Sequence, residues 1–261
     1  MCEVSYRPLI DDMVWSYSRI KTFDDCPYRF YLRYIDRCKE KDMFYASYGS
    51  FMHKLIEKYY KQELSKDEMV TEFLLGFSSK VKGDRPAPNT VDKYIKCGVD
   101  YLTSFKPFPF EMIDVEMRTE FEINGLKFIG YIDYLGEKDG DLYIVDNKSR
   151  DLKPRSKRKT PTLKDQELDS MLKQLYLYSA GVKEKYGKFP KSLCFNCFKS
   201  GVFIEEPFNE QAYDDTIDWA LRSIETIKST TDFYPLIDYF GCTHICGVCD
   251  DCIYSPANNR K

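Results

Sequence analysis

The spacing of apolar positions has a helical period over most of the first 106 residues. We expect helical structure over 16–64, 67–82 and 89–106. Ser16 or Ser18 can cap the first helix, and Pro27 suits the first turn of a second. The segment 83–88, Gly-Asp-Arg-Pro-Ala-Pro, separates the last two helices because glycine and proline interrupt regular structure.

The pattern changes from Val115 to Ser149, where β-branched and aromatic residues dominate. Asn124-Gly125 and Lys138-Asp139-Gly140-Asp141 are hairpin signals within this stretch. They predict strands near 116–123, 126–136 and 142–149. Further along we expect a helix over 165–186, strands near 191–199 and 202–206, and a helix over 209–230. Helices on both sides of a β-meander indicate an α/β fold with a central mixed sheet flanked by helices.

Length and composition narrow the classes of protein that the chain can belong to. Its 261 residues allow one large domain or two small ones, and 39 basic against 42 acidic side chains leave a net charge of −3. No apolar run approaches the ~20 residues that span a bilayer, and no secretion signal opens the chain, so we expect a cytoplasmic protein without a membrane partner. In that compartment, ten cysteines indicate metal or cluster ligands more than disulfides.

Two carboxylates and a lysine stand on neighbouring predicted strands. Asp146 and Lys148 share one face of their strand, since residues two apart point the same way. A turn centred on Lys138-Asp139 places Asp133 opposite Ile144 and therefore diagonal to Asp146, at roughly 7–8 Å. Such a pair can converge on Mg²⁺, while an ordinary surface ion pair is the alternative. Because the strand is otherwise apolar, charges in its middle are costly without a function.

The cysteines cluster near the carboxyl end. Cys246-x2-Cys249-x2-Cys252 has the spacing of three thiolates on one iron–sulfur cluster, which needs a fourth ligand from elsewhere. The alternative is zinc bound by the four tail cysteines, with Cys242 as the fourth, and spacing alone does not separate the two. Cys194 and Cys197 lie in a predicted strand, where an offset of three puts them on opposite faces, so we exclude them from a metal site.

A basic stretch begins at Lys148, so the chain has a local region of positive charge although its net charge is negative. Its members are Lys148, Arg150, Lys153, Arg155, Lys157, Arg158 and Lys159, interrupted by one acid, Asp151. They run into a predicted mobile loop containing Pro154 and Pro161. A basic loop beside a metal site suits a polyanion backbone, because Lys and Arg contacts displace its counterions.

Five motifs follow one another in a familiar order. They are Gly49-Ser-Phe-Met-His53, Glu116, Asp133, Asp146-Asn-Lys148 and Gln174-Leu-Tyr-Leu-Tyr178. Together with the opening Ser18-Arg-Ile-Lys-Thr-Phe-Asp-Asp-Cys26-Pro, they resemble the PD-(D/E)XK nuclease superfamily, in its RecB-like branch with a four-cysteine iron–sulfur site. The resemblance runs from about residue 16 to 254. It implies a restriction-endonuclease-like core and a divalent-metal-dependent DNA nuclease, an exonuclease, that uses Mg²⁺ or Mn²⁺.

The resemblance also implies roles for individual residues. His53, Asp133 and Asp146 would be metal ligands, with the carbonyl of Asn147 as a fourth, and Lys148 would be the catalytic lysine. Gln174 and Tyr178 would hold the active site or the DNA strand, and Glu116 would support the metal site. The chain departs from the family name in having Ile132 before Asp133, and Asp rather than Glu before the x-Lys; both changes keep the ligand chemistry.

For the cysteines, the resemblance supplies Cys26 as the fourth ligand of a 4Fe-4S cluster with Cys246, Cys249 and Cys252. Cys242 remains a rival ligand, because the tail departs from the usual spacing of the branch. The cluster would join both ends of one nuclease domain, 1–261. Its parts would be an N-terminal helical segment (16–64), a catalytic core (115–206) and a cysteine-rich tail (240–254).

Relatives in that branch include recombination and repair nucleases and CRISPR-associated exonucleases. The resemblance therefore implies DNA, single-stranded or at duplex ends, as the partner, and admits a helicase or recombination protein. The host would be a bacterial, archaeal or virus-infected cell. The competing hypothesis is a non-catalytic module that binds nucleic acid or protein and contains a structural zinc site.

Overall fold

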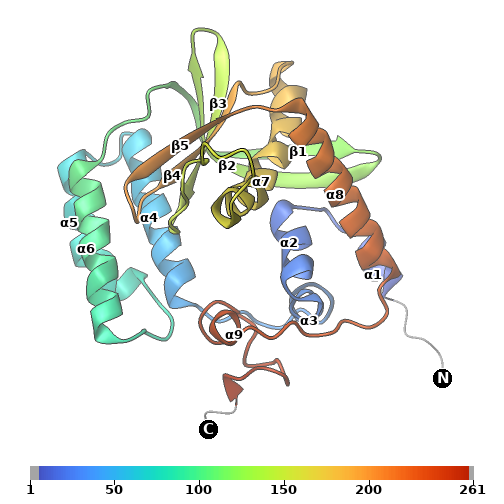
Figure 1. Cartoon of the computed structure of the whole chain (residues 1–261). Coiled ribbons are helices and arrows are strands. Elements are labelled where there is room, and N and C mark those ends of the chain that lie inside the picture. The colour runs from blue at the N-terminus through green and yellow to red at the C-terminus, as the bar shows by residue number, and fades with distance from the viewer. Residues whose placement is uncertain (1–5, 259–261) are drawn as a thin grey trace.

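The computed structural model describes residues 6–258, which contain a five-stranded sheet in the order β1-β2-β3-β4-β5 (Figure 1). The strands are β1 (Glu111–Ile123), β2 (Leu126–Lys138), β3 (Asp141–Lys148), β4 (Ser192–Cys197) and β5 (Val202–Pro207). β3 and β4 are parallel, and the other neighbours are antiparallel. The sheet is therefore mixed and flanked by helices, which confirms the predicted α/β class.

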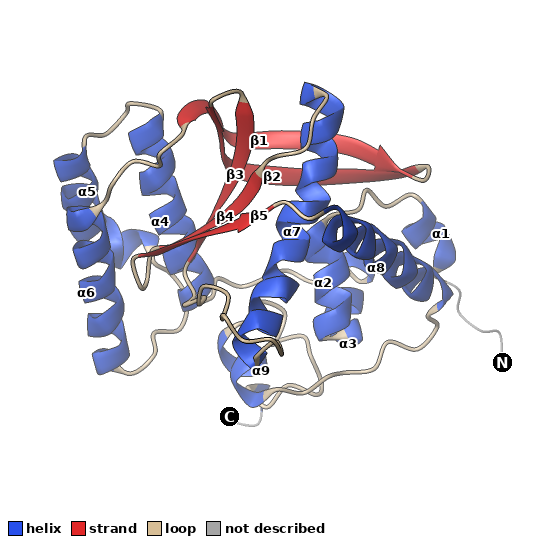
Figure 2. Cartoon of the chain, turned by 45° about the horizontal axis from the view of Figure 1, so that its top comes forward, coloured by secondary structure: helices blue, strands red, loops and turns tan. Residues whose placement is uncertain are grey.

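Most of the helices precede the sheet in sequence, and the rest follow β3. They are α1 (Arg7–Asp11), α2 (Tyr17–Asp25), α3 (Pro27–Phe30), a π-helical turn (Tyr31–Ile35), α4 (Phe44–Tyr60), α5 (Lys66–Lys80), α6 (Pro88–Ser104), α7 (Leu163–Tyr186), α8 (Glu210–Ser229) and α9 (Tyr239–His244). Figure 2 shows α4, α5 and α6 grouped on one side of the sheet and α1, α2, α3 and α8 grouped on the other. Among the described residues, no helix is long and apolar enough to cross a bilayer.

Each face of the sheet has its own apolar core. One face packs on α7, backed by α2 and α8, through residues such as Met117, Ile132 and Ile144. The other face contributes Val115, Tyr134 and Val145 to a smaller cluster. Tyr60, at the end of α4, extends that cluster, since its ring lies 4.6 Å from Tyr134 and its hydroxyl accepts from the Phe108 N–H.

The hairpin between β2 and β3 turns one residue later than the sequence indicates. Lys138 pairs with Asp141, so the turn is Asp139-Gly140, and both residues have positive φ, as a tight two-residue hairpin requires. The predicted turn at Lys138-Asp139 is therefore wrong by one residue. This error moves each cross-strand partner by two residues, so the residues of the paired region stay on their predicted faces. The pairing ends at Tyr134–Val145, so Asp133 is the first residue of β2 beyond it, and its carboxylate accepts from the Asn147 N–H of β3.

The N-terminal helical region is less continuous than expected. Residues 36–43 are not helical, and the long helix α4 begins only at Phe44 and ends at Tyr60. Ser16 caps α2 by accepting from the Arg19 N–H, and Pro27 opens α3, as the sequence indicates. The short helices α1 and α9 were not expected, because stretches of five and six residues are too short for a periodic pattern.

Candidate active site

β2 leaves β3 at the point where the candidate site begins. Its pairing with β3 covers only Tyr134 to Lys138, and nearer the start of β2 the segment before α2 takes the place of β3 through a bridge from Trp15 to Phe128. The Asn147 backbone N–H donates to Asp133 Oδ2 at 2.7 Å. A side-chain carboxylate thus satisfies a backbone donor where the strands separate.

Glu116 adopts an unusual backbone conformation in the middle of β1. Its φ is 55°, in the left-handed region that non-glycine residues rarely occupy. Val115 packs with Tyr134 on one face of the sheet, whereas Met117 packs with Ile132 on the other, although residues two apart in a regular strand share a face. The change of face occurs at Glu116 and Asp133, which lie at a gap in the pairing of β1 with β2, between Val115–Tyr134 and Met117–Ile132. Strain of this kind is commonest at functional sites.

His53, Glu116 and Asp133 come together at this point. Each offers a ligand atom, and these atoms all lie within 4.8 Å of one another. His53 comes from α4, and its Nδ1 lies 3.2 Å from Asp133 Oδ2. Gly49, one turn earlier on the same helix, lies next to Ser149, and a Cβ there would be 3.4 Å from Ser149 Oγ, an ordinary van der Waals contact.

Asp146, Lys148 and Gln174 form a second group beside the first. Lys148 Nζ lies 2.7 Å from Asp146 Oδ2 and donates to Gln174 Oε1 at 2.8 Å. The Gln174 amide in turn donates from Nε2 to Asp146 Oδ1 at 2.9 Å and reaches the Tyr178 hydroxyl at 3.5 Å. Gln174 on α7 therefore contacts both ends of the Asp-x-Lys pair and fixes their relative positions.

Burial and the close charges shift the acid–base behaviour of the site. Burial raises the pKa of the Glu116 carboxyl to about 7, and the Asp133 carboxylate adds to the effect. Burial also raises the pKa of Asp146 to about 6, against the opposing charge of Lys148. Burial opposes the charges of His53 and Asp133, but their mutual attraction outweighs it, so the pKa of His53 is raised and that of Asp133 is lowered.

These donors fit a divalent cation. Carboxylate oxygens suit Mg²⁺ and Mn²⁺, and imidazole is a further ligand for Mn²⁺-class metals. Asp146 Oδ2 is buried, forms the ion pair with Lys148 and accepts no hydrogen bond from any other described residue, so it keeps acceptor capacity for a ligand. A cation would also favour the ionised form of Glu116, which burial alone disfavours.

The structure brings some predicted site residues closer together than others. His53 and Asp133 lie in the ligand group as expected, and Glu116 joins them, where the sequence indicated only a supporting role. Asp146 lies outside that group of three and is bound to Lys148 and Gln174. The Asn147 side chain points the other way, accepting from Asn196 Nδ2 at 2.6 Å, in agreement with strand alternation.

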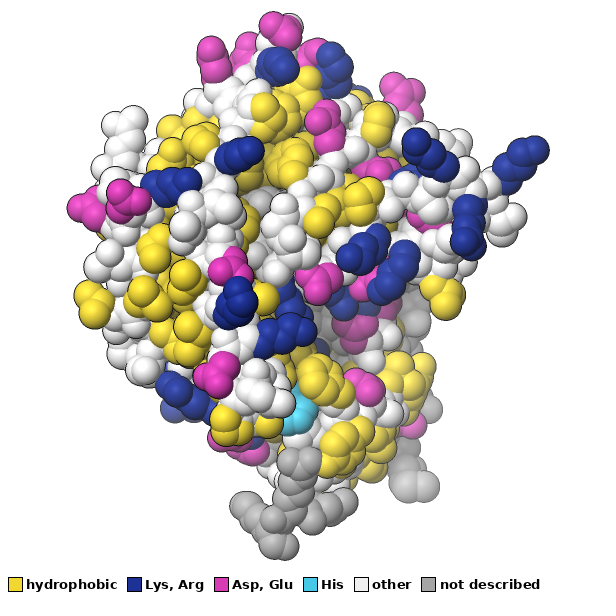
Figure 3. Space-filling view, turned by 60° about the vertical axis from the view of Figure 1, so that its left-hand side comes forward, with side chains coloured by type: hydrophobic (Ala, Val, Ile, Leu, Met, Phe, Trp, Pro, Cys, Tyr) yellow, Lys and Arg dark blue, Asp and Glu magenta, His cyan; other side chains and the backbone are white. Residues whose placement is uncertain are grey.

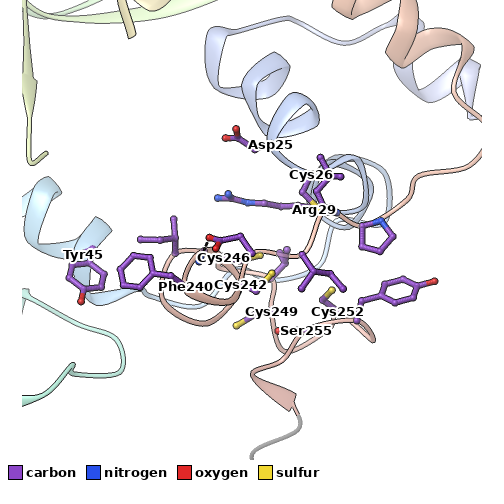
Figure 4. A pocket seen from close by; sticks show the side chains of 18 of the residues that line it. Asp25, Cys26, Arg29, Tyr45, Phe240, Cys242, Cys246, Cys249, Cys252 and Ser255 are labelled. Atoms are coloured by element: carbon purple, nitrogen blue, oxygen red, sulfur yellow. Dashed lines mark hydrogen bonds between the residues drawn. The ribbon is translucent and has the colours of Figure 1, made fainter. Parts of the chain in front are cut away.

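The cysteines of both chain ends line one cavity, shown in Figure 4. Cys26, at the junction of α2 and α3, shares this cavity with the four tail cysteines, Cys242, Cys246, Cys249 and Cys252. The Cys26 sulfur accepts from the backbone N–H groups of Arg29 and Leu236, both at 3.4 Å. Burial raises the pKa of the Cys246, Cys249 and Cys252 thiols, and bound metal would compensate the charge of their thiolates. Cys194 and Cys197 are buried in separate cores on opposite faces of the sheet, as predicted.

The basic loop after β3 is anchored at both ends. Asp165, in the first turn of α7, accepts from the backbone and hydroxyl groups of Ser156 and Thr162. Arg155 contacts Glu206 and Asp169, each at 2.7 Å. Four other cations of the loop are exposed and have no ion pair within the described chain: Lys153, Lys157, Arg158 and Lys159. Figure 3 shows Lys and Arg side chains gathered around a hollow on one face of the molecule.

Comparisons with known proteins agree with this geometry. The family model of the PD-(D/E)XK nuclease superfamily matches residues 14–257. A solved structure from Eubacterium rectale, named "Putative exonuclease", is 12% identical over 90% of both chains, with a TM-score of 0.53, and shows the fold alone. The protein SSO0001 is 16% identical over 90% of this chain and 85% of its own, but its TM-score of 0.35 carries no argument. No curated protein sequence matches the chain. The family match spans nearly the whole sequence, and the chain therefore belongs to the PD-(D/E)XK nuclease superfamily.

Proposed function

We propose that the chain is a divalent-metal-dependent DNA exonuclease of the RecB-like branch, which hydrolyses phosphodiester bonds. The observation that carries the proposal is the adjacency of two groups of side chains. His53, Glu116 and Asp133 form a ligand group within 4.8 Å, and Lys148 lies beside Asp146, across the strand pair from Asp133. A metal site next to a buried lysine is the arrangement that phosphodiester hydrolysis needs.

His53, Glu116 and Asp133 would hold Mg²⁺ or Mn²⁺, with the buried Asp146 carboxylate as a further ligand. The ion, when bound, polarises the scissile phosphate and lowers the pKa of an attacking water. For this, Glu116 must be ionised and His53 neutral, so protons leave both residues on loading. The Asn147 carbonyl, next to the Asp133 contact, is the further ligand that the family resemblance implies.

Lys148 supplies the positive charge that the chain itself brings to the reaction. Its ammonium group is held between Asp146 and Gln174, which leaves one of its three N–H donors for a water or a phosphate oxygen. Donors fixed before the reaction stabilise developing charge without the cost of reorganisation. Gln174 is a positioning residue here, and Tyr178 supports it through the Nε2 contact.

The cysteine cavity supports a 4Fe-4S cluster bound by Cys26, Cys246, Cys249 and Cys252. Cys26, from the amino-terminal helices, lines the cavity together with the tail cysteines, so the four ligands that the cluster requires share one space. The four tail cysteines alone would suit zinc. Cys242 lines the same cavity and remains a rival ligand.

Digestion of end-labelled DNA tests the proposal. Anaerobically purified protein should release short products from labelled DNA ends with Mg²⁺ or Mn²⁺, and none with EDTA. Asp133→Asn and Lys148→Met should each lower the rate by about 100-fold or more. Arg118→Gln, an exposed charge change on β1, is the control and should cut normally. Absence of cleavage by the wild-type protein, or normal cleavage by Lys148→Met, would refute the proposal.

A further inference from the structure

The cavity that contains the cysteines extends toward the candidate active site as far as the residues after Lys148. Its volume is about 840 Å³, and its lining includes Ser149, Arg150 and Asp151, which directly follow Lys148. At the opposite end it reaches Cys26 and the tail cysteines. One continuous space therefore connects the end of β3 with the cysteine site.

This space is larger than a metal centre requires. Pockets that enclose drug-sized organic ligands have volumes of about 300–1,000 Å³, a size class that includes nucleotides. The cavity lies in the upper part of that range. A second occupant beside the metal centre is therefore possible on size alone, and the lining residues indicate its chemistry.

Aromatic rings from three elements form one wall of the cavity. Tyr45 of α4 lies 5.4 Å from Tyr94 of α6 and 5.7 Å from Phe240 of α9, measured between ring centroids. Figure 4 shows the Tyr45 and Phe240 rings next to each other at one end of the cavity. Phe240 is 52% exposed, and Tyr45 and Tyr94 are half-buried, so ring surface remains available. Such rings are platforms on which unpaired bases stack.

Two cations also line the cavity. Lys199 Nζ lies 5.1 Å from the Tyr94 ring centroid, and its neighbour Phe198 donates a backbone hydrogen bond to the Lys148 carbonyl. Arg29 extends into the cavity from α3, and its buried Nε has no hydrogen-bond partner (Figure 4). Neither cation has an ion-pair partner within 4 Å in the described chain, so both are available to phosphate oxygens.

The carboxylates of the lining are mostly engaged by the protein itself. Asp25 pairs with Lys21, Glu167 with Lys164, and Asp238 accepts from the Gly241 N–H at the start of α9. Among the described lining residues, Asp151 is the carboxylate with no such contact; burial and then the Asp151 charge raise the pKa of the Tyr94 hydroxyl. Lys199 offsets that charge at the Tyr94 ring, and Arg29 is a further cation of the cavity.

We propose that this cavity is the binding site for a single DNA strand, whose bases stack on Tyr45, Tyr94 and Phe240 and whose phosphates contact Lys199 and Arg29. The inference rests on the proposed function and names its substrate class. A duplex fits poorly, because its bases already stack on one another and do not offer their faces to the rings. The strand would run between the candidate metal site and the cysteine site, with the exposed cations of the basic loop nearby.

Fluorescence anisotropy tests this site without cleavage. The probe is a 5′-fluorescein oligo-dT of 20 nucleotides, and the comparison is a blunt 20-base-pair duplex, both in metal-free buffer. Tyr94→Leu should weaken single-strand binding about tenfold, the effect of one lost stacking contact. Tyr94→Phe keeps the ring and should bind within about twofold of the wild type. Lys199→Gln, which leaves the stacked rings intact, should reduce the salt dependence of log K by about 0.7.

The matched control is Lys138→Gln, at the exposed end of the β2–β3 hairpin, which should bind both probes normally. The inference is overturned if Tyr94→Leu and Lys199→Gln bind the single strand like the wild type, or if they lose duplex binding equally. A wild-type protein that cuts no DNA, but whose variants lose single-strand binding, would remove the proposed catalysis and keep the strand site. If the wild type and both variants cleave DNA and both variants bind the single strand normally, the proposed catalysis stands and the strand site is refuted.

Discussion

Glu116 is the residue whose role the structure changes most, and its substitution gives the sharpest test of the metal site. The isosteric change Glu116→Gln removes one ligand atom and one titrating carboxyl. Because the pKa of Glu116 lies at about 7, about nine in ten molecules carry a proton there at pH 6, and about one in ten at pH 8. Metal must displace that proton to use the carboxylate.

This competition has a predictable size. In the wild type, Glu116 alone should strengthen Mn²⁺ binding about tenfold between pH 6 and pH 8. Asp146 and His53, which also lose protons on rising pH, add to that dependence in both proteins. Glu116→Gln should therefore bind Mn²⁺ more weakly at pH 8, and its affinity should rise about tenfold less than that of the wild type across this interval.

Calorimetric titration with Mn²⁺ at pH 6, 7 and 8 measures this difference and does not depend on activity. Glu120→Gln is the matched control, since Glu120 lies on the same strand, is exposed, and pairs with Arg118. The control should reproduce the wild-type curve. Parallel pH dependences for the wild type and Glu116→Gln would show that Glu116 is not a ligand, and the assignment would be wrong.

Three further outcomes follow from contacts in the site and in the cysteine cavity. Gln174→Met should lower kcat about 100-fold in single-turnover cleavage while Mn²⁺ affinity stays unchanged, because Lys148 and Asp146 lose the amide that fixes them; a loss of less than about threefold would contradict this. Gly130→Ala should reduce the free energy of unfolding in urea by about 1–3 kcal/mol, since its Cβ would lie 2.5 Å from the Tyr178 ring, and unchanged stability would exclude that close packing. Cys26→Ser should yield protein without iron or brown colour and with a lower Tm, whereas Cys38→Ser, outside the cavity, should keep both; iron retained by Cys26→Ser would remove Cys26 from the ligand set.

The sequence predicts strand faces better than strand positions, and the β2–β3 hairpin shows why. Alternation depends only on parity, so moving the turn from Lys138-Asp139 to Asp139-Gly140 changes the cross-strand partners but keeps each residue of the paired region on its predicted face. Which two residues turn depends on φ preferences that four consecutive turn-forming residues nearly share. The same parity argument correctly separates Cys194 from Cys197.

Long-range geometry explains what the sequence leaves out. The left-handed conformation of Glu116 has no sequence signal, since glutamate has no preference for it, and this conformation accompanies its entry into the ligand group. The aromatic wall joins Tyr45, Tyr94 and Phe240 from three helices, and no spacing within one element could indicate it. The order of the motifs along the chain is enough to indicate the family, but only the packed structure shows which side chains meet.

The most direct test of the account is the position of bound Mn²⁺ in crystals of the protein, located by its anomalous scattering. The account predicts a peak within about 2.0–2.3 Å of ligand atoms from His53, Glu116 and Asp133, beside the Asp146–Lys148 pair. A peak coordinated elsewhere, or no peak at these residues in a protein that cleaves DNA with Mn²⁺, would contradict it.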